Sequence, residues 1–225
     1  ESSTATHIRT EVYGGTFVVN GTHSAGVQVW GGTLAGTGSV GDILHAAGTV
    51  SPGGDTTTGI LRATGYSGGT SRYFYMDLRG TTPGTEYDRL EVSGVANINN
   101  THLAVHAPVA LPPGAQLTIL TNATGQFYGL PEGAIIHAGN KLRISYVGGD
   151  GNDVVLTNVS APSLHGPAVP PTFDEDAGIV TVGFTVGHEV LLPSQLTVTA
   201  ASLNQTLLPQ ENMSLFGNGT GRAIF

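Results

Sequence analysis

A short phrase of glycine, threonine and an apolar residue returns three times in the first quarter of the chain. The copies are Gly15-Thr16-Phe17, Gly32-Thr33-Leu34 and Gly48-Thr49-Val50, at steps of 17 and then 16 residues. A fixed period with a glycine corner and a β-branched residue is typical of a coiled sheet in which each turn of the chain stacks on the one before. We therefore predict an all-β fold that begins as a parallel β-solenoid, or β-helix.

Composition supports this class of fold and excludes others. Glycine supplies 34 of the 225 residues, and charged residues make up 11%, against roughly 25% in ordinary soluble domains. Residues in helical spacing are scarce, so we expect almost no helix. The net charge is −8 with a single lysine, Lys141, which excludes the basic surface of a nucleic-acid binder. The chain has no cysteine and no run of 18 apolar residues, so we expect no disulfides and no membrane insertion.

Short glycine-bounded runs with alternating apolar residues predict the strands. They cover residues 16–19, 26–30, 39–44, 48–50, 60–63, 72–78, 89–92, 96–98, 101–106, 116–120, 141–147 and 153–156. The inward side chains expected in the first coils are Phe17, Val19, Val27, Val29, Leu34, Val40, Ile43, Leu44 and Val50. In residues 72–78, Phe74, Met76 and Leu78 alternate with Tyr73, Tyr75 and Asp77, so we expect the first set to be buried and the second to face water.

A change in composition divides the chain into two domains. We expect a solenoid domain over residues 1–157 and a proline-rich linker over 158–171. Residues 172–225 contain three strand-like runs, 179–186, 195–201 and 213–216, which suit a small immunoglobulin-like (Ig-like) β-sandwich. A complete sandwich of this type needs roughly 100 residues, so the second domain is expected to be incomplete.

Several motifs in the first domain resemble the autotransporter-associated β-strand repeats of large bacterial surface proteins. They lie at residues 31–41, 47–53, 80–90, 129–134 and 143–156. The resemblance implies a right-handed β-helix that serves as an extracellular stalk or spacer without a catalytic set. Residues 196–209 look like the opening of a bacterial Ig-like adhesin repeat.

Two acidic segments are candidate calcium sites. Residues 148–156 fit the nonapeptide G-G-x-G-x-D-x-U-x, in which Asp150 and Asp153 would supply oxygen ligands. A single copy is more commonly a glycine turn between strands. Asp174 and Asp176 beside the linker are the second candidate, with a solvated acidic turn as the alternative.

Catalytic arrangements are not evident, and we expect the chain not to be an enzyme. Asp77, Glu86, Asp88 and Glu91 cluster near Arg79 and Arg89, and surface ion pairs explain this pattern. His102 and His106 share one face of a predicted strand about 13 Å apart, too far for one metal ion. Seven N-x-Ser/Thr sequons are candidate glycosylation sites: Asn20, Asn99, Asn122, Asn158, Asn204, Asn212 and Asn218.

These features favour a structural subunit or module of an extracellular bacterial filament, sheath or cell-surface stalk. A solenoid must cap its end coils or join them to another chain. We expect copies to assemble head to tail, with the segment within residues 1–12 adding a strand to the C-terminal domain of a neighbour. The assembly strand would consist of His7, Ile8, Arg9, Thr10, Glu11 and Val12.

The alternative is an adhesin or carbohydrate-binding module on the cell surface. Tyr66, Tyr73, Tyr75 and Tyr87 would then form an aromatic platform, because exposed rings can stack on sugars. Tyr73 and Tyr75 point the same way in a strand and are the candidate glycan contacts. Cross-strand packing of these rings is the structural alternative.

Overall fold

The computed structural model describes residues 9–69, 71–160, 162–167, 172, 178–188 and 192–224. The chain divides into two units, Glu1–Val159 and Ser160–Phe225. In the described residues the regular structure is β-strand, apart from two 3-10 turns, η1 (Pro193–Gln195) and η2 (Gln210–Asn212). The prediction of an all-β chain is confirmed for this part of the sequence.

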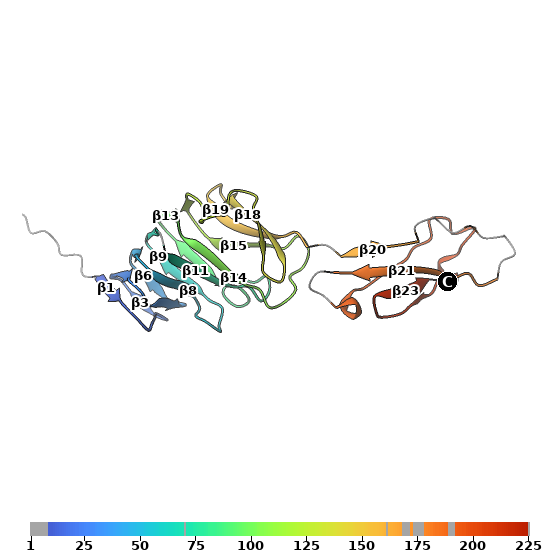
Figure 1. The fold of residues 1–225 in the computed structure, drawn as a ribbon, viewed down its shortest axis with the longest axis horizontal. Helices are drawn as coiled ribbons and strands as arrows, with labels where there is room; N and C mark the ends of the chain where they lie inside the picture. The colour runs from blue at the N-terminus through green and yellow to red at the C-terminus, as the bar shows by residue number, and fades with distance from the viewer. Residues whose placement is uncertain are drawn as a thin grey trace, which may run out of the picture. The chain divides into compact units, whose positions relative to one another are not determined.

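Figure 1 draws the strands of the first unit in colours that run from blue to yellow. Strands β1 to β16 belong in turn to three sheets, and each strand from β1 to β13 pairs in parallel with the strand three places later. Sheet A contains β1 (Arg9–Val12), β4 (Gly26–Val29), β7 (Ile43–His45), β10 (Tyr66–Ser67), β13 (Ala96–Asn97) and β16 (Ala123–Thr124). Sheet B contains β2 (Thr16–Val18), β5 (Thr33–Gly36), β8 (Gly48–Pro52), β11 (Arg72–Asp77) and β14 (His102–His106). Sheet C contains β3 (Thr22–His23), β6 (Ser39–Val40), β9 (Ile60–Ala63), β12 (Arg89–Val92), β15 (Gln116–Leu120), β19 (Asp153–Asn158), β18 (Lys141–Gly148) and β17 (Ile135–His137). We call three consecutive strands, one from each sheet, a coil.

The repeated phrase of the sequence sets the register of sheet B. Thr16 pairs with Thr33 and Thr33 with Thr49, in parallel strands. The same ladder continues from Thr49 to Tyr73 and from Tyr73 to His102, at steps of 24 and 29 residues. The longer steps do not break the ladder, because the added residues lie in connections between strands. Parallel pairing is therefore confirmed, and it extends beyond the recognisable repeat.

Glycine at the corner of each repeat allows neighbouring coils to approach. A Cβ on Gly32 would lie 2.6 Å from the carbonyl oxygen of Gly15, and a Cβ on Gly48 would lie 2.3 Å from that of Gly32. Gly48 also has φ +84°, a conformation that side chains disfavour. The glycine is thus required by contact with the preceding coil as well as by the turn.

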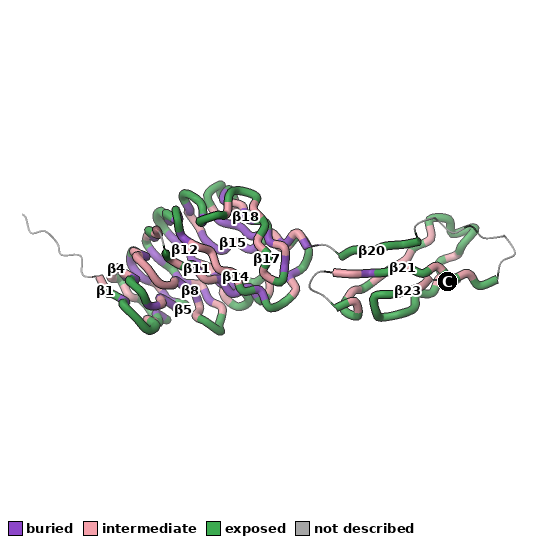
Figure 2. Tube along the Cα trace, viewed as in Figure 1, coloured by how far each residue is buried: buried purple, intermediate pink, exposed green. Residues whose placement is uncertain are grey.

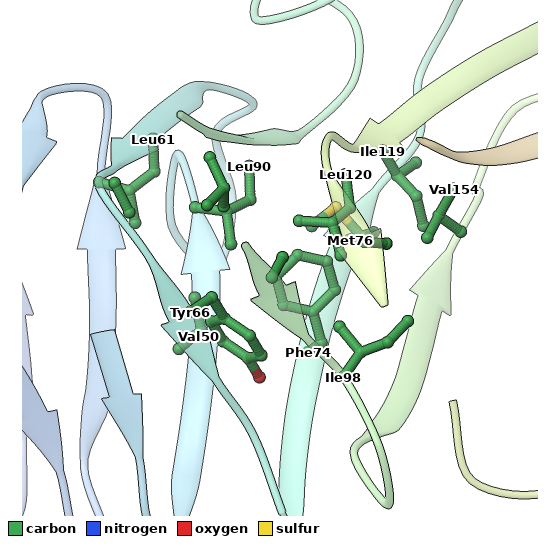
Figure 3. Packing of buried hydrophobic residues seen from close by; sticks show 14 of the residues in the cluster. Val50, Leu61, Tyr66, Phe74, Met76, Leu90, Ile98, Ile119, Leu120 and Val154 are labelled. Carbon is green, nitrogen blue, oxygen red and sulfur yellow. The ribbon is translucent and has the colours of Figure 1, made fainter. Parts of the chain in front are cut away.

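The core lies between the three sheets and is formed by the inward side chains of successive coils (Figures 2 and 3). Leu61, Leu90 and Leu120 follow one another along sheet C, and all three are fully buried. On sheet B, Val50 and Phe74 are paired and fully buried. Burial of a side chain of this size contributes about 1.5–3 kcal/mol. These residues all belong to one hydrophobic cluster, so the apolar interior is continuous from coil to coil.

Two predictions about which side chains face inward need correction. Leu44 is half-buried, and His45 beside it is completely buried in its place. Phe17 on the first strand of sheet B packs against the core as predicted and is half-buried. Asp77 was expected to face water but is completely buried, because the chain after β11 folds back over it.

The parallel stack ends in antiparallel strands. β15 pairs antiparallel with β19, β19 with β18, and β18 with β17. The strands predicted over 141–147 and 153–156 are present as β18 and β19, joined through Gly149 and Gly151, which both have positive φ. Their return onto β15 covers the last parallel strand of sheet C and was not predicted.

The proposed assembly strand is only partly described. His7 and Ile8 lie outside the described residues. Arg9, Thr10, Glu11 and Val12 form β1 and pair with β4 of the same chain. These four residues are therefore paired along one edge within their own sheet A, where β1 is the outer strand, and their addition to a neighbour stays a prediction.

The second unit contains one four-stranded antiparallel sheet in its described residues. The strand order is β20 (Ser163–His165), β21 (Val182–Gly187), β23 (Gly221–Ile224) and β22 (Leu215–Phe216). β20 falls in the segment that was predicted to be a linker. The strand predicted over 195–201 is wrong, because that segment follows η1 and joins no sheet. The described residues of the second unit form no second sheet. Among all the residues that the structure describes, no helix is long and apolar enough to cross a membrane.

Replacing Phe74 by alanine tests the shared core. Its ring is fully buried and packs near the rings of Tyr66 on β10 and Phe127 after β16, with centroids 6.0 and 5.7 Å away. We expect Phe74→Ala to lower the free energy of unfolding by about 3–5 kcal/mol, measured by urea denaturation. Tyr73→Ala on the same strand, where the ring is 52% exposed, is the matched control and should cost less than about 1 kcal/mol. Equal losses in the two variants would contradict this assignment of the faces.

Candidate functional site

Sheet B presents a regular outer face. The residues that pair along it and point away from the core form what we call the outer row: Thr16, Thr33, Thr49, Tyr73 and His102. They alternate with inward residues such as Leu34, Val50 and Phe74, which are fully buried. Parallel pairing spaces the outer residues by about 4.8 Å, so the row is a straight line of side chains across five coils.

Aromatic rings occupy the later end of the outer row. The centroids of Tyr73 and His102 lie 5.4 Å apart with planes inclined at 31°. Tyr128, whose backbone N–H donates to the Thr101 carbonyl, extends the row, with its ring centroid 4.7 Å from that of His102. Tyr73 and Tyr128 leave 52% and 62% of their surface exposed. These three rings form a continuous exposed cluster.

The predicted platform of four tyrosines is therefore replaced by a different set. Tyr73 is exposed as expected, but Tyr75 is half-buried and has Ala104 as its neighbour on β14. Burial, followed by the charge of Asp77, raises the pKa of Tyr75. Tyr66 and Tyr87 are buried and cannot meet a glycan. His102 and Tyr128 were missed because their distance from Tyr73 in the sequence hides the register.

A second aromatic pair lies at the corner between sheets A and B. Tyr13 and Trp30 directly follow β1 and β4, which are paired, and their rings are stacked at 6.2 Å with an angle of 6°. Both are exposed. The Tyr13 hydroxyl donates a hydrogen bond to Glu11 Oε2 at 2.9 Å. Neither residue was predicted to belong to a functional site.

Buried carboxyl groups lie at the other end of β11. Asp77 Oδ1 is 2.6 Å from His106 Nδ1, and Asp77 Oδ2 is 3.1 Å from an Arg79 nitrogen. Asp88 accepts hydrogen bonds from the backbone N–H groups of Gly59 and Asp77 at 2.8 and 2.9 Å. Both aspartates are completely buried, so the expected surface ion pair is wrong for them. Glu91, in contrast, does form partly exposed ion pairs with Arg62 and Arg89.

The surroundings of Asp88 have opposing effects on its pKa. Burial raises its pKa to about 7, against the two backbone N–H donors that favour the carboxylate, and the nearby charge of Asp77 adds to the increase. A carboxyl group that titrates near neutral pH is often catalytic. Here, however, both oxygens are bound to backbone donors and closed off from solvent, so the group fastens the connections around residues 59 and 77 to each other.

His45 on sheet A is buried and links two other groups by hydrogen bonds. His45 Nε2 lies 3.0 Å from the Gly48 carbonyl oxygen, and His45 Nδ1 lies 2.8 Å from the Tyr66 hydroxyl. Because the carbonyl can only accept, Nε2 carries the proton and Nδ1 accepts from Tyr66. Burial lowers the pKa of His45 to about 4. The register would have revealed this inward histidine, since Val12, Val29 and His45 occupy one position in successive coils.

The calcium candidates receive no support from a ligand cluster. Within the described residues no group of three or more His, Asp or Glu side chains is placed to hold a metal ion. Asp150 is exposed in the turn, while Asp153 Oδ1 accepts a hydrogen bond from the Asn122 backbone N–H at 3.1 Å. Asp174 and Asp176 lie outside the described residues.

The seven sequons differ in accessibility. Asn158 is buried, and its side-chain nitrogen donates to the carbonyls of Leu111 and Pro112, so it has no room for a glycan in this fold. The side-chain nitrogen of half-buried Asn122 donates to the Val92 carbonyl at 2.6 Å. The remaining sequon asparagines are exposed: Asn20, Asn99, Asn204, Asn212 and Asn218.

Comparison with family models, curated proteins and solved structures finds no match to this chain. The candidate site therefore stands on geometry alone. Its two parts are the exposed rings of the outer row and the enclosed aspartates at the end of β11.

The raised pKa of Asp88 predicts a specific pH dependence of stability. Between its ordinary value of 3.8 and about 7, the folded chain keeps a proton on Asp88 that the unfolded chain has released. The contribution of Asp88 to stability is therefore present at low pH and lost as the pH rises to 7. His45 acts in the opposite direction, because its lowered pKa removes stability as the pH falls from 6.5 to about 4.

We expect Asp88→Asn to uncover the contribution of His45. Between pH 4.5 and 6.5, the free energy of unfolding of the variant should rise with pH more steeply than that of the wild type, by about 1 kcal/mol per pH unit. Urea denaturation at several pH values measures how the free energy of unfolding changes with pH. Asparagine at this position loses one acceptor for a backbone N–H, but that loss is the same at every pH and does not change the slope. Infrared detection of a protonated carboxyl group at pH 6, absent from Asp88→Asn, is the independent check. An unchanged slope would mean that Asp88 is ionised in the fold.

Proposed function

We propose that this chain is a non-enzymatic structural module of an extracellular filament, sheath or cell-surface stalk, and that its first unit is a β-solenoid. The observation that supports this most directly is the unbroken parallel ladder from Thr16 to His102. Each coil adds about 4.8 Å by pairing with the previous one, so the number of coils sets the length of the module. A right-handed winding is proposed because connections between parallel strands of one sheet are nearly always right-handed.

The buried aspartates also favour a structural role. Asp88 is bound by two backbone N–H groups, and Asp77 by His106 and Arg79. Both are fully buried, whereas a catalytic carboxyl group must reach a substrate. The contacts of Asp88 join the connection that follows β8 to the end of β11.

Assembly of copies is part of the same proposal. Within the described residues, β1, β2 and β3 are each the outer strand of a sheet. In the second unit, β20 and β22 are the outer strands of the antiparallel sheet. Outer strands carry backbone groups that can pair with another chain. We infer a head-to-tail contact in which an outer strand of the first coil adds to the second unit of a neighbour.

The second unit fits this role if it is part of an Ig-like sandwich. Val186 is the single buried apolar side chain among its described residues, and Leu164, Leu215 and Phe216 are exposed on its strands. A strand supplied by a neighbour would extend this sheet and cover some of the apolar surface.

Concentration-dependent assembly tests the proposal. We expect sedimentation velocity and electron microscopy of the full chain to show linear oligomers that grow with protein concentration. Val18→Lys places a charge on the outer strand β2, where Val18 is 52% exposed. This variant should need an at least tenfold higher protein concentration to form oligomers. Val95→Lys, at a 61% exposed position between β12 and β13, is the matched control. Monomers at all concentrations would contradict assembly through these edges.

A further inference from the structure

The exposed tyrosine and tryptophan side chains of the described first unit form two groups. They are Tyr13, Trp30, Tyr73 and Tyr128, with exposed fractions of 68%, 43%, 52% and 62%. Tyr73 and Tyr128 belong to the later end of the outer row, while Tyr13 and Trp30 lie at the corner that leads into β2 and β5. We call the outer row, Tyr128 and the Tyr13–Trp30 pair at the corner before it the strip, and exposed rings grouped in this way indicate a binding surface.

Threonines connect the two aromatic groups. Thr16, Thr33 and Thr49 precede Tyr73 in the outer row, one in each coil. The outer row therefore presents three hydroxyl groups and then the rings of Tyr73 and His102, at a spacing of about 4.8 Å. Within the described residues, the hydroxyls of Tyr73 and Tyr128 make no hydrogen bond to the protein, so they remain available to a ligand.

The chemistry of the strip selects a class of ligand. Aromatic surfaces pack against the C–H faces of sugars, and hydroxyl groups both donate and accept hydrogen bonds with sugar hydroxyls. The outer row contains no acidic or basic residue other than His102. The chain carries a net charge of −8, and the acid that contacts the strip, Glu11, accepts from Tyr13. These charges oppose an anionic polymer.

We propose that this strip binds a neutral, extended polysaccharide. Its sugar rings lie against Tyr73 and Tyr128, and its hydroxyl groups bond to Thr33, Thr49 and His102. A linear polymer fits because the contacts repeat along a line instead of converging in a pocket. This site goes beyond the scaffold proposal and does not depend on it, since a single unassembled chain carries the whole strip.

Affinity electrophoresis with defined polymers tests the proposal. The probes are hydroxyethylcellulose, laminarin and dextran as neutral glucans, with alginate as the anionic comparison. We expect at least one neutral glucan to retard the wild-type chain and alginate not to. The double variant Tyr73→Ala, Tyr128→Ala should lose about tenfold or more in affinity, because truncated contact residues at the centre of a site commonly cost more than 1 kcal/mol.

Matched variants separate ring contact from folding. Tyr73→Trp keeps an aromatic surface and should retain binding, whereas Tyr73→Ala should weaken it. Phe216→Ala removes a ring that is 52% exposed in the second unit and should leave binding unchanged. Circular dichroism of each variant confirms that the fold is kept.

Three results would overturn the proposal. The first is retardation by none of the neutral glucans, and the second is retardation by alginate alone. The third is a wild-type oligomer that Tyr73→Ala, Tyr128→Ala converts to monomers, because the strip would then be an interface between copies.

Discussion

Backbone pairing between successive coils is the constraint on which the rest of the first unit depends. Two paired parallel strands lie about 4.8 Å apart, and a side chain at the corner that precedes them would prevent this approach. Gly32 and Gly48 meet the requirement, because a Cβ on either would collide with the carbonyl of the previous coil. Once the corners are fixed, every strand of sheet B is in register from Thr16 to His102.

That register decides which side chains are removed from water. Inward positions stack as Leu34, Val50 and Phe74 and form a continuous apolar interior. A polar residue at an inward position must then find a partner in the core, and His45 does so through Gly48 and Tyr66. Burial lowers the pKa of His45 to about 4, so the folded chain holds this histidine in its neutral form at neutral pH.

The same register turns outward side chains into lines along the stack. Tyr73 and His102 are 29 residues apart in the sequence but adjacent in the sheet, and Tyr128 continues the line. A repeating scaffold can in this way present a repeated surface without a cleft. On β11 the outward positions of the alternating pattern carry both the exposed ring of Tyr73 and the enclosed carboxyl group of Asp77.

The sequence alone determined the longer strands of the first unit, the stacking of its first three repeats and the burial of Phe74, Met76 and Leu78, because these follow from local glycine spacing and a period of two. The short strands β3, β10, β16 and β17 carry no such pattern and were not predicted. Only the tertiary structure decided the burial of Asp77, which depends on a later connection folding over β11. It also placed β1 in sheet A and joined β19 to β15. Such contacts link segments whose separation varies with the length of the connections, so no fixed spacing announces them.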